Sequence, residues 1–132
     1  MLKYMLDTNI VIYTLKNRPA KVRKSFENHH GQMCISSVTW GELVYGAEKS
    51  ARIEENLAVL EAFAARLKIA DFDASSAEHF GQVRAELSKK GRSIGPYDMM
   101  IAGHARALGL VLITNNVKEF VRVPGLRVKN WA

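Results

Sequence analysis

The feature that most constrains the fold is the regular alternation of short apolar runs with longer helical patterns. Five runs rich in β-prone residues lie near 3–6, 33–36, 67–72, 110–114 and 126–130. Six segments with helical patterning occur between them, at 9–17, 20–30, 37–50, 52–67, 75–91 and 96–109. Strands that alternate with helices in this way predict an α/β domain with a mainly parallel central sheet.

Local signals mark several helix ends. Ser75 and Glu78 fit a capping box at the start of the fifth helix, and Gly91 is expected to close it. Pro96 is placed to open the sixth helix and Gly109 to end it. These signals place the sixth helix between a loop and the strand near 110–114.

Composition limits the organisation and the class of partner. The chain has 132 residues, of which 48% are hydrophobic, enough for one core, so residues 1–132 are expected to form a single domain. No apolar run reaches the roughly 18 residues of a membrane span, and no secretory signal is recognisable, so we expect a cytoplasmic protein without a membrane partner. The net charge of +6 favours anionic partners such as nucleic acid.

Four acidic residues follow the predicted strands or begin a helix beside them. Asp7 comes directly after the first strand, and Glu42 lies a few residues beyond the second. Asp98 falls in the first turn of the sixth helix, and Glu119 follows the strand near 110–114. In open parallel sheets, ligands bind outside the carboxyl ends of the strands. Most of these acids are therefore expected at one edge of the sheet.

Each acid also has an ordinary structural explanation. Asp7 fits the N-cap of the helix that follows it, and Glu42 completes a capping box with Thr39. At Asp98, a negative charge would complement the positive end of a helix for roughly 0.3–1 kcal/mol. Glu119 fits a solvated acid on a short helical turn. Taken one at a time, the acids leave both explanations open.

Taken together, the acids favour a metal site. Carboxylates a few Å apart repel one another, and their pKa values rise unless a cation lies between them. Mg²⁺ takes oxygen ligands and is usually held by one or two carboxylates plus phosphate oxygens of the substrate. Clustered acids in a basic chain therefore point to phosphodiester chemistry, in which the basic surface gathers the polyanion and the ion lets its phosphate approach the carboxylates.

Four ordered blocks of the chain carry a family resemblance. They read MLDTNIVIY, SSVTWGELVYGA, GRSIGPYDMMIAGHA and LVLITNNVKEF. Together they resemble the motif blocks of the PIN-domain nucleases, in particular the VapC toxins of bacterial type II toxin–antitoxin systems. The resemblance implies a PIN-like parallel sheet with helices on both faces, metal-dependent RNA cleavage, and Asp7, Glu42 and Asp98 as an acidic triad. Where many PIN domains have Asp, this chain has Asn116, and Glu119 is our candidate for the missing charge.

The resulting scheme gives the acids different roles. Mg²⁺, with Mn²⁺ as a substitute, is expected to be held by the triad, mainly by Asp7 and Asp98, while Glu42 orients or deprotonates the attacking water. Glu119 is counted among the catalytic residues. In-line hydrolysis would leave a 5′-phosphate and a 3′-hydroxyl.

Neighbouring polar residues are candidates for supporting roles. Thr114 is placed to support a metal-bound water, and Asn116 can offer a carbonyl oxygen. Asn9 is placed to orient Asp7 by hydrogen bonding, although turn formation explains it equally well. His104 follows Asp98 by six residues, a spacing that does not put the two side chains on one helix face, so no acid–base role is predicted for it.

Three basic residues are candidates for RNA contacts. Lys89, Lys90 and Arg92 precede Asp98 closely and could contact phosphates. A helix C-terminus that favours positive charge explains the same residues equally well.

The resemblance also implies a biological role and partners. It implies an endoribonuclease toxin that acts on RNA, with tRNA and in particular initiator tRNA as the expected target. It further implies a VapB-type antitoxin, a homodimer, and a larger assembly with the antitoxin on operator DNA. An apolar strip on the helix at 52–67 is the expected docking surface for an antitoxin segment. The alternative is a non-catalytic PIN-like module that binds nucleic acid or acts as a repressor scaffold.

Overall fold

The computed structural model describes residues 1–132 and confirms the parallel sheet. The strands are β1 (Tyr4–Leu6), β2 (Met33–Ser36), β3 (Lys68–Ala70), β4 (Val111–Ile113) and β5 (Arg127–Lys129). They lie in the order β3-β2-β1-β4-β5, and every neighbouring pair is parallel. Each observed strand lies within one of the five predicted runs.

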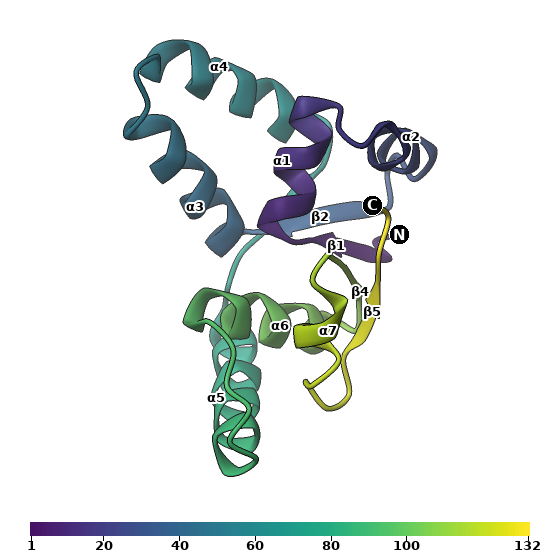
Figure 1. The fold of residues 1–132 in the computed structure, drawn as a ribbon, viewed down its shortest axis with the longest axis vertical. Coiled ribbons are helices and arrows are strands. Elements are labelled where there is room, and N and C mark those ends of the chain that lie inside the picture. Colours follow the sequence, from purple (N-terminus) through teal and green to yellow (C-terminus); the bar gives the residue numbers. More distant parts are fainter.

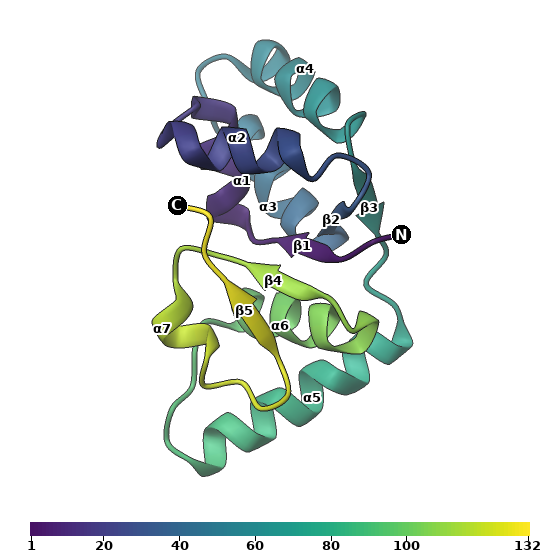
Figure 2. The same cartoon turned by 90° about the vertical axis from the view of Figure 1, so that its right-hand side faces the viewer.

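Seven helices cover the two faces of the sheet. They are α1 (Thr8–Lys16), α2 (Ala20–Asn28), α3 (Ser37–Glu48), α4 (Ile53–Ala64), α5 (Ala74–Lys89), α6 (Pro96–Leu108) and α7 (Val117–Phe120). Helices α1 to α4 lie on one side of the sheet and α5 to α7 on the other (Figures 1 and 2). None of the helices combines the length and apolarity that a membrane crossing requires.

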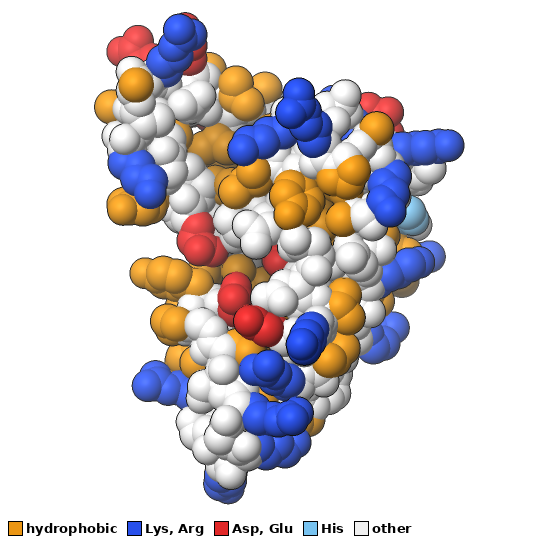
Figure 3. Space-filling model, viewed as in Figure 1, with side chains coloured by type: hydrophobic (Ala, Val, Ile, Leu, Met, Phe, Trp, Pro, Cys, Tyr) orange, Lys and Arg blue, Asp and Glu red, His pale blue; other side chains and the backbone are white.

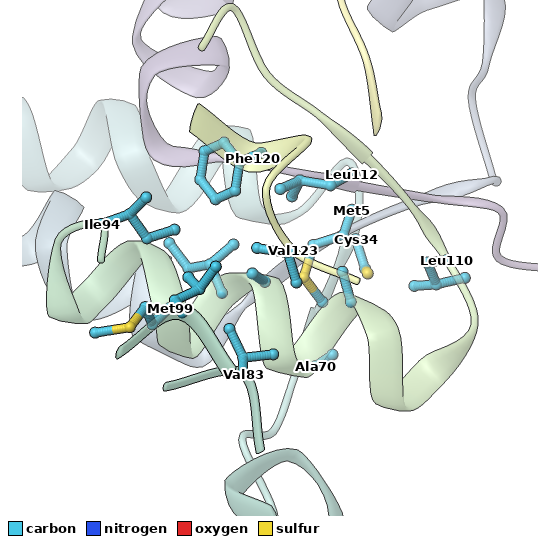
Figure 4. Close-up of a cluster of buried hydrophobic side chains, with 14 residues drawn as sticks. Met5, Cys34, Ala70, Val83, Ile94, Met99, Leu110, Leu112, Phe120 and Val123 are labelled. Carbon is cyan, nitrogen blue, oxygen red and sulfur yellow. The ribbon is translucent and has the colours of Figure 1, made fainter. Parts of the chain in front are cut away.

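Side chains that point alternately to the two faces of the sheet divide the hydrophobic core into two layers. Met5 and Leu112 point to the side of α5 to α7, where they pack with residues such as Phe120 (Figure 4). Their neighbours Leu6 and Ile113 point to the opposite side and pack with α1 to α4. Because successive side chains of a strand face opposite ways, one short strand supplies both layers. Burying each such side chain stabilises the fold by roughly 1.5–3 kcal/mol.

The chain reverses direction across the sheet between β1 and β4. From β1 it builds outward through β2 to β3, then returns to the other side of β1 to form β4 and β5. Leu6 pairs with Ile113 at this junction, and both strands end there. Such a topological switch point opens a crevice at the carboxyl ends of the strands. The residues that follow, Asp7 and Thr114, are therefore neighbours.

The helix ends confirm three predicted signals and correct a fourth. Gly91 and Gly109 adopt positive φ at the ends of α5 and α6, and Pro96 is the first residue of α6. The predicted capping box of Ser75 and Glu78 is wrong. Asp73 caps α5 instead, because its carboxylate accepts from the backbone N–H of Ser76 at 3.0 Å and the helix begins at Ala74.

Close contact between α5 and α6 fixes the position of the helix that carries Asp98. A Cβ atom at Gly103 of α6 would lie 2.6 Å from the backbone nitrogen of Phe80 in α5. Only glycine allows the two backbones to approach this closely. Helix α6 is thus held tightly against α5 below the sheet.

Candidate active site

Asp7 lies at the carboxyl end of β1 and is the N-cap of α1. Its Oδ1 accepts a hydrogen bond from the backbone N–H of Ile10 at 3.0 Å. Its Oδ2 accepts one from the Thr114 hydroxyl at 2.5 Å. The capping explanation of Asp7 is therefore correct, and it is compatible with a site, because an ionised carboxylate has about four acceptor positions.

The environment of Asp7 destabilises its negative charge. Burial raises the pKa of this carboxyl, since only 3% of the residue is exposed. Hydrogen bonds from Thr114 and from the backbone of Ile10 and Asn9 oppose that effect, and the Glu42 carboxylate adds to it. The net pKa is raised. A nearby cation would stabilise the ionised form.

Glu42 faces Asp7 from α3 and is held by Thr8. The Thr8 hydroxyl donates to Glu42 Oε1 at 2.8 Å. Helix α3 begins at Ser37 with Ser36 as its N-cap, so Glu42 lies in the second turn of the helix. The predicted alternative, a capping box with Thr39, is therefore wrong, and the side chain is directed across to α1.

Asp98 joins the two other acids from α6. Burial raises its pKa to about 6, and the negative charges of Asp7, Glu42 and Glu119 raise it in the same direction. The charges that shift the pKa of this carboxyl are all negative. The shift shows that the four predicted acids lie within one electrostatic cluster.

The cluster lies in a hollow on one face of the molecule. Figure 3 shows acidic side chains gathered at the middle of this face, with basic side chains above and below them. Glu42 and Thr8 line a cleft of about 940 Å³, whose wall includes the exposed Tyr45 and Tyr97. They also line a second hollow of about 410 Å³ between α1, α3 and α4. Glu42 is thus the acid of the cluster that faces both hollows directly.

The donor atoms of the cluster suit a hard divalent ion. Carboxylate oxygens dominate it, and the buried Oδ1 of Asn115, next to Thr114 in the chain, has no hydrogen-bond partner. No three acidic, histidine or cysteine side chains are arranged to hold one ion among them. The predicted three-carboxylate set of Asp7, Glu42 and Asp98 is therefore not a closed cage. Two carboxylates are sufficient for Mg²⁺, which usually keeps several waters and takes phosphate oxygens.

The structure shows contacts of the supporting residues, and the predicted roles of Thr114 and Asn116 stay predictions. Thr114 donates to Asp7 and accepts from the backbone N–H of Asn116 at 2.9 Å, so it orients the carboxylate. Its contact with a water stays a prediction. The Asn9 side chain is exposed, and it is the Asn9 backbone that lowers the pKa of Asp7. Asn116 precedes α7, and its side chain does not cap that helix.

Thr8 is the site residue that the sequence did not reveal. A threonine at the first position of a helix is unremarkable, and its partner is 34 residues away in the chain. Only the packing of α1 against α3 brings the two side chains together. No local signal identifies such a contact.

The three predicted RNA-contacting residues lie at the far end of α5 and in the loop that follows it. Lys89 is the last residue of α5, Lys90 is its C-cap, and both are exposed, as is Arg92. Figure 2 shows this end of α5 at the lower tip of the molecule, from which the loop rises to α6. Their role in RNA binding stays a prediction.

Comparison with known proteins decides the family. Residues 4–126 match the PIN domain family. The chain is 59% identical over 132 residues to the tRNA(fMet)-specific endonuclease VapC of Shigella flexneri, and the match covers 100% of both chains. The protein belongs to the VapC family of PIN-domain nucleases. It is therefore a nuclease, and the non-catalytic alternative is not retained.

Solved structures of other VapC proteins confirm the fold. The DNA-bound VapBC complex of Salmonella typhimurium contains a chain with 55% identity and a TM-score of 0.96, with 100% of both chains covered. The VapBC2 complex of Rickettsia felis, bound to a DNA fragment from its promoter, gives 41% identity and a TM-score of 0.93, with coverage of 99% and 100%. This VapC-family protein therefore has the PIN-domain architecture that its motif blocks predicted.

Proposed function

We propose that this nuclease is the toxin of a toxin–antitoxin pair and hydrolyses tRNA in a Mg²⁺-dependent reaction. The observation that carries the proposal is the gathering of Asp7, Glu42 and Asp98 from β1, α3 and α6, where Thr114 bonds Asp7 and Thr8 bonds Glu42. Relatives with 59% and 56% identity over nearly the whole chain are named tRNA(fMet)-specific endonucleases, which supports initiator tRNA as the target. We further propose that residues 1–132 act as one domain, in the cytoplasm where tRNA is used.

The proposed chemistry divides the four acids by their environments. Asp7 and Asp98 would hold the ion, because burial and mutual repulsion make their ionised forms depend on a cation. When bound, a divalent ion polarises the phosphate and lowers the pKa of water. Glu42, kept in one orientation by Thr8, would orient the attacking water and accept its proton. Glu119 supplies negative charge that Asn116 lacks.

Divalent metals are used generally by PIN-domain nucleases, which supports a metal at this cluster. We propose Mg²⁺ as the ion, with Mn²⁺ able to replace it, since both accept carboxylate and water ligands. Three residues, Asp7, Asp98 and Glu42, stay our candidates for direct or water-mediated contact. Two of these carboxylates, together with phosphate oxygens of the substrate, would be enough to bind one Mg²⁺ ion.

We propose that a VapB-type antitoxin binds the hollow between α1, α3 and α4. Its wall includes Ile12, Leu15 and Leu60, and Val59 beside them is 50% exposed. Because Glu42 lines the same hollow, a segment bound there would lie next to the acids. The related solved structures are VapBC complexes, two of them with DNA, which supports assembly with an antitoxin on operator DNA. We also propose that the toxin is a homodimer.

A matched pair of variants tests the nuclease site. Asp7→Asn and Asp73→Asn both replace an N-cap aspartate with an equally good cap, so helix capping is preserved in each. The assay is cleavage of bulk tRNA with Mg²⁺ and with EDTA, after circular dichroism has shown that both variants are folded. We expect cleavage by the wild type and Asp73→Asn with Mg²⁺ only, and none by Asp7→Asn. Cleavage by Asp7→Asn at the wild-type rate, or full cleavage in EDTA, would refute the proposal.

A further inference from the structure

A buried hydrogen bond joins the helix that carries Asp98 to the base of the helix that carries Glu42. The Nδ1 atom of His104 in α6 lies 2.8 Å from the Ser36 hydroxyl, 68 residues earlier in the chain. Ser36 is 0% exposed and His104 is 1% exposed. Ser36 ends β2 and is the N-cap of α3. The bond therefore ties α6 to the point where β2 becomes α3.

The neighbours of Ser36 and His104 leave both groups free to form this hydrogen bond. Ser36 Oγ already accepts from the backbone N–H of Val38 at 3.0 Å, so its hydroxyl proton is free to be donated. Burial lowers the pKa of His104, although Asp73 and Asp71 oppose this effect, so the imidazole is neutral and Nδ1 can accept. Ser36 Oγ also keeps a second lone pair, so the hydroxyl or the imidazole can be the donor of this bond, according to the tautomer of His104.

Further contacts hold the residues around the Ser36–His104 hydrogen bond in place. The ring of Phe72 meets the His104 ring edge-on, with centroids 5.5 Å apart. The backbone N–H of Phe72 donates to the Ser37 hydroxyl at 3.0 Å, which connects the end of β3 to the first residue of α3. On the other side, the close approach of α5 at Gly103 holds α6. His104 is therefore enclosed by segments that cannot shift independently.

The Ser36–His104 hydrogen bond lies the same number of residues from Glu42 on α3 as from Asp98 on α6. Glu42 lies six residues after Ser36 on α3, and Asp98 lies six residues before His104 on α6. Six residues of helix span roughly 9 Å. Glu42 and Asp98 are thus each separated from the bonded pair by a similar length of helix. Their charges repel each other, which favours separation of the two helices unless something resists it.

We propose that the Ser36–His104 hydrogen bond is a positioning device that sets the separation of Asp98 and Glu42 for metal binding. This inference rests on the proposed function, since it assumes that these carboxylates serve a metal-dependent reaction. His104 acts as a positioning residue and touches neither substrate nor metal. Its role would explain why a polar pair occupies a buried position, where a hydrophobic residue would fill the space without needing a partner.

The test compares a variant that breaks the bond with one that restores it. His104→Leu removes the bonding nitrogen, whereas His104→Asn places an amide group, which can accept or donate, close to the position of Nδ1. The control is Ser76→Ala. This change also removes a buried serine hydroxyl, which donates to the carboxylate of Asp73. Ser76 lies on α5, a helix that carries none of the four acids. Mn²⁺ affinity is measured by calorimetry without RNA, and kcat and KM are measured on tRNA at a temperature well below the Tm of every variant.

Positioning and simple stabilisation predict different results. A misplacement of about 1 Å in an active site can lower the rate by about 10²-fold. We expect His104→Leu to bind Mn²⁺ several-fold more weakly and to lose about ten- to a hundred-fold in kcat with little change in KM. His104→Asn should recover most of both losses, and Ser76→Ala should lower only the Tm.

Two outcomes would overturn the inference. One is wild-type Mn²⁺ affinity and kcat in a folded His104→Leu variant, and the other is the same loss in a folded His104→Asn variant. If His104→Leu does not fold, Ser36→Gly breaks the same bond, because glycine costs only a few tenths of a kcal/mol as an N-cap. Failure of the proposed function would be distinct, since the wild type itself would then not cleave tRNA or not bind Mn²⁺.

Discussion

Replacing Asp98 with asparagine should stabilise the metal-free protein while it removes activity. The pKa of Asp98 is raised from its ordinary value of 3.8 to about 6 by burial and by the neighbouring carboxylates. The folded state therefore binds this proton more tightly than the unfolded state does. The stability that protonation contributes is fully present below about pH 4 and is lost as the pH rises through about 6.

The size of the effect follows from the pKa difference. A difference of about 2 between the folded and unfolded pKa corresponds to about 3 kcal/mol of stability lost on ionisation. Asparagine also loses the favourable interaction of a carboxylate with the N-terminus of α6, which is worth roughly 0.3–1 kcal/mol. Salt and solvent in the open cleft weaken the repulsion further, so we expect Asp98→Asn to be more stable by about 1–2 kcal/mol at pH 8.

Urea unfolding followed by circular dichroism measures the difference. Wild type and Asp98→Asn are compared with EDTA at pH 8 and at pH 4.5, because only the difference between the two proteins isolates this carboxyl. The advantage of the variant should shrink at the lower pH, where wild-type Asp98 is protonated. Added Mn²⁺ should stabilise only the wild type. A variant that is equally or less stable than the wild type at pH 8, or an advantage that does not depend on pH, would refute the reasoning.

Three further predictions concern the residues around the acids. Thr8→Val should lower kcat about tenfold with KM unchanged, because Glu42 loses the hydrogen bond that orients it; unchanged single-turnover rates would contradict this. Thr114→Val removes a hydrogen bond that lowers the pKa of Asp7, so the acidic limb of the pH–rate profile should move to higher pH. A limb that stays in place or moves to lower pH would be evidence against the role of that bond. Arg92→Gln should weaken tRNA binding and lower its salt slope by about 1 if the arginine contacts a phosphate, whereas an unchanged slope would favour a purely structural role.

The sheet and most helix ends could be predicted because their signals are local. The runs that became β1 and β4 are apolar on both faces, as a buried parallel strand requires, and their positions were correct. Asp7 illustrates how one local signal can have two meanings. It caps α1, and it also lies at the switch point, because the residue after a buried strand serves both purposes.

The other features of the site depend on contacts between residues far apart in the sequence, which local sequence signals do not predict. Thr8 meets Glu42, and Ser36 meets His104, only because helices distant in sequence pack together. The start of α5 was mispredicted for a different reason. Asp73 and Ser75 are both good capping residues two positions apart, and the choice between them is settled by the path of the chain out of β3.

The most direct test of the account is the chemistry of the cut ends of initiator tRNA after cleavage with Mg²⁺. Four acids clustered at the carboxyl edge of the sheet, with the pKa of Asp98 raised to about 6, fit a site that activates water against a phosphodiester. The account predicts fragments that carry a 5′-phosphate and a 3′-hydroxyl. A 2′,3′-cyclic phosphate would contradict it, because the ribose hydroxyl and not water would then be the nucleophile.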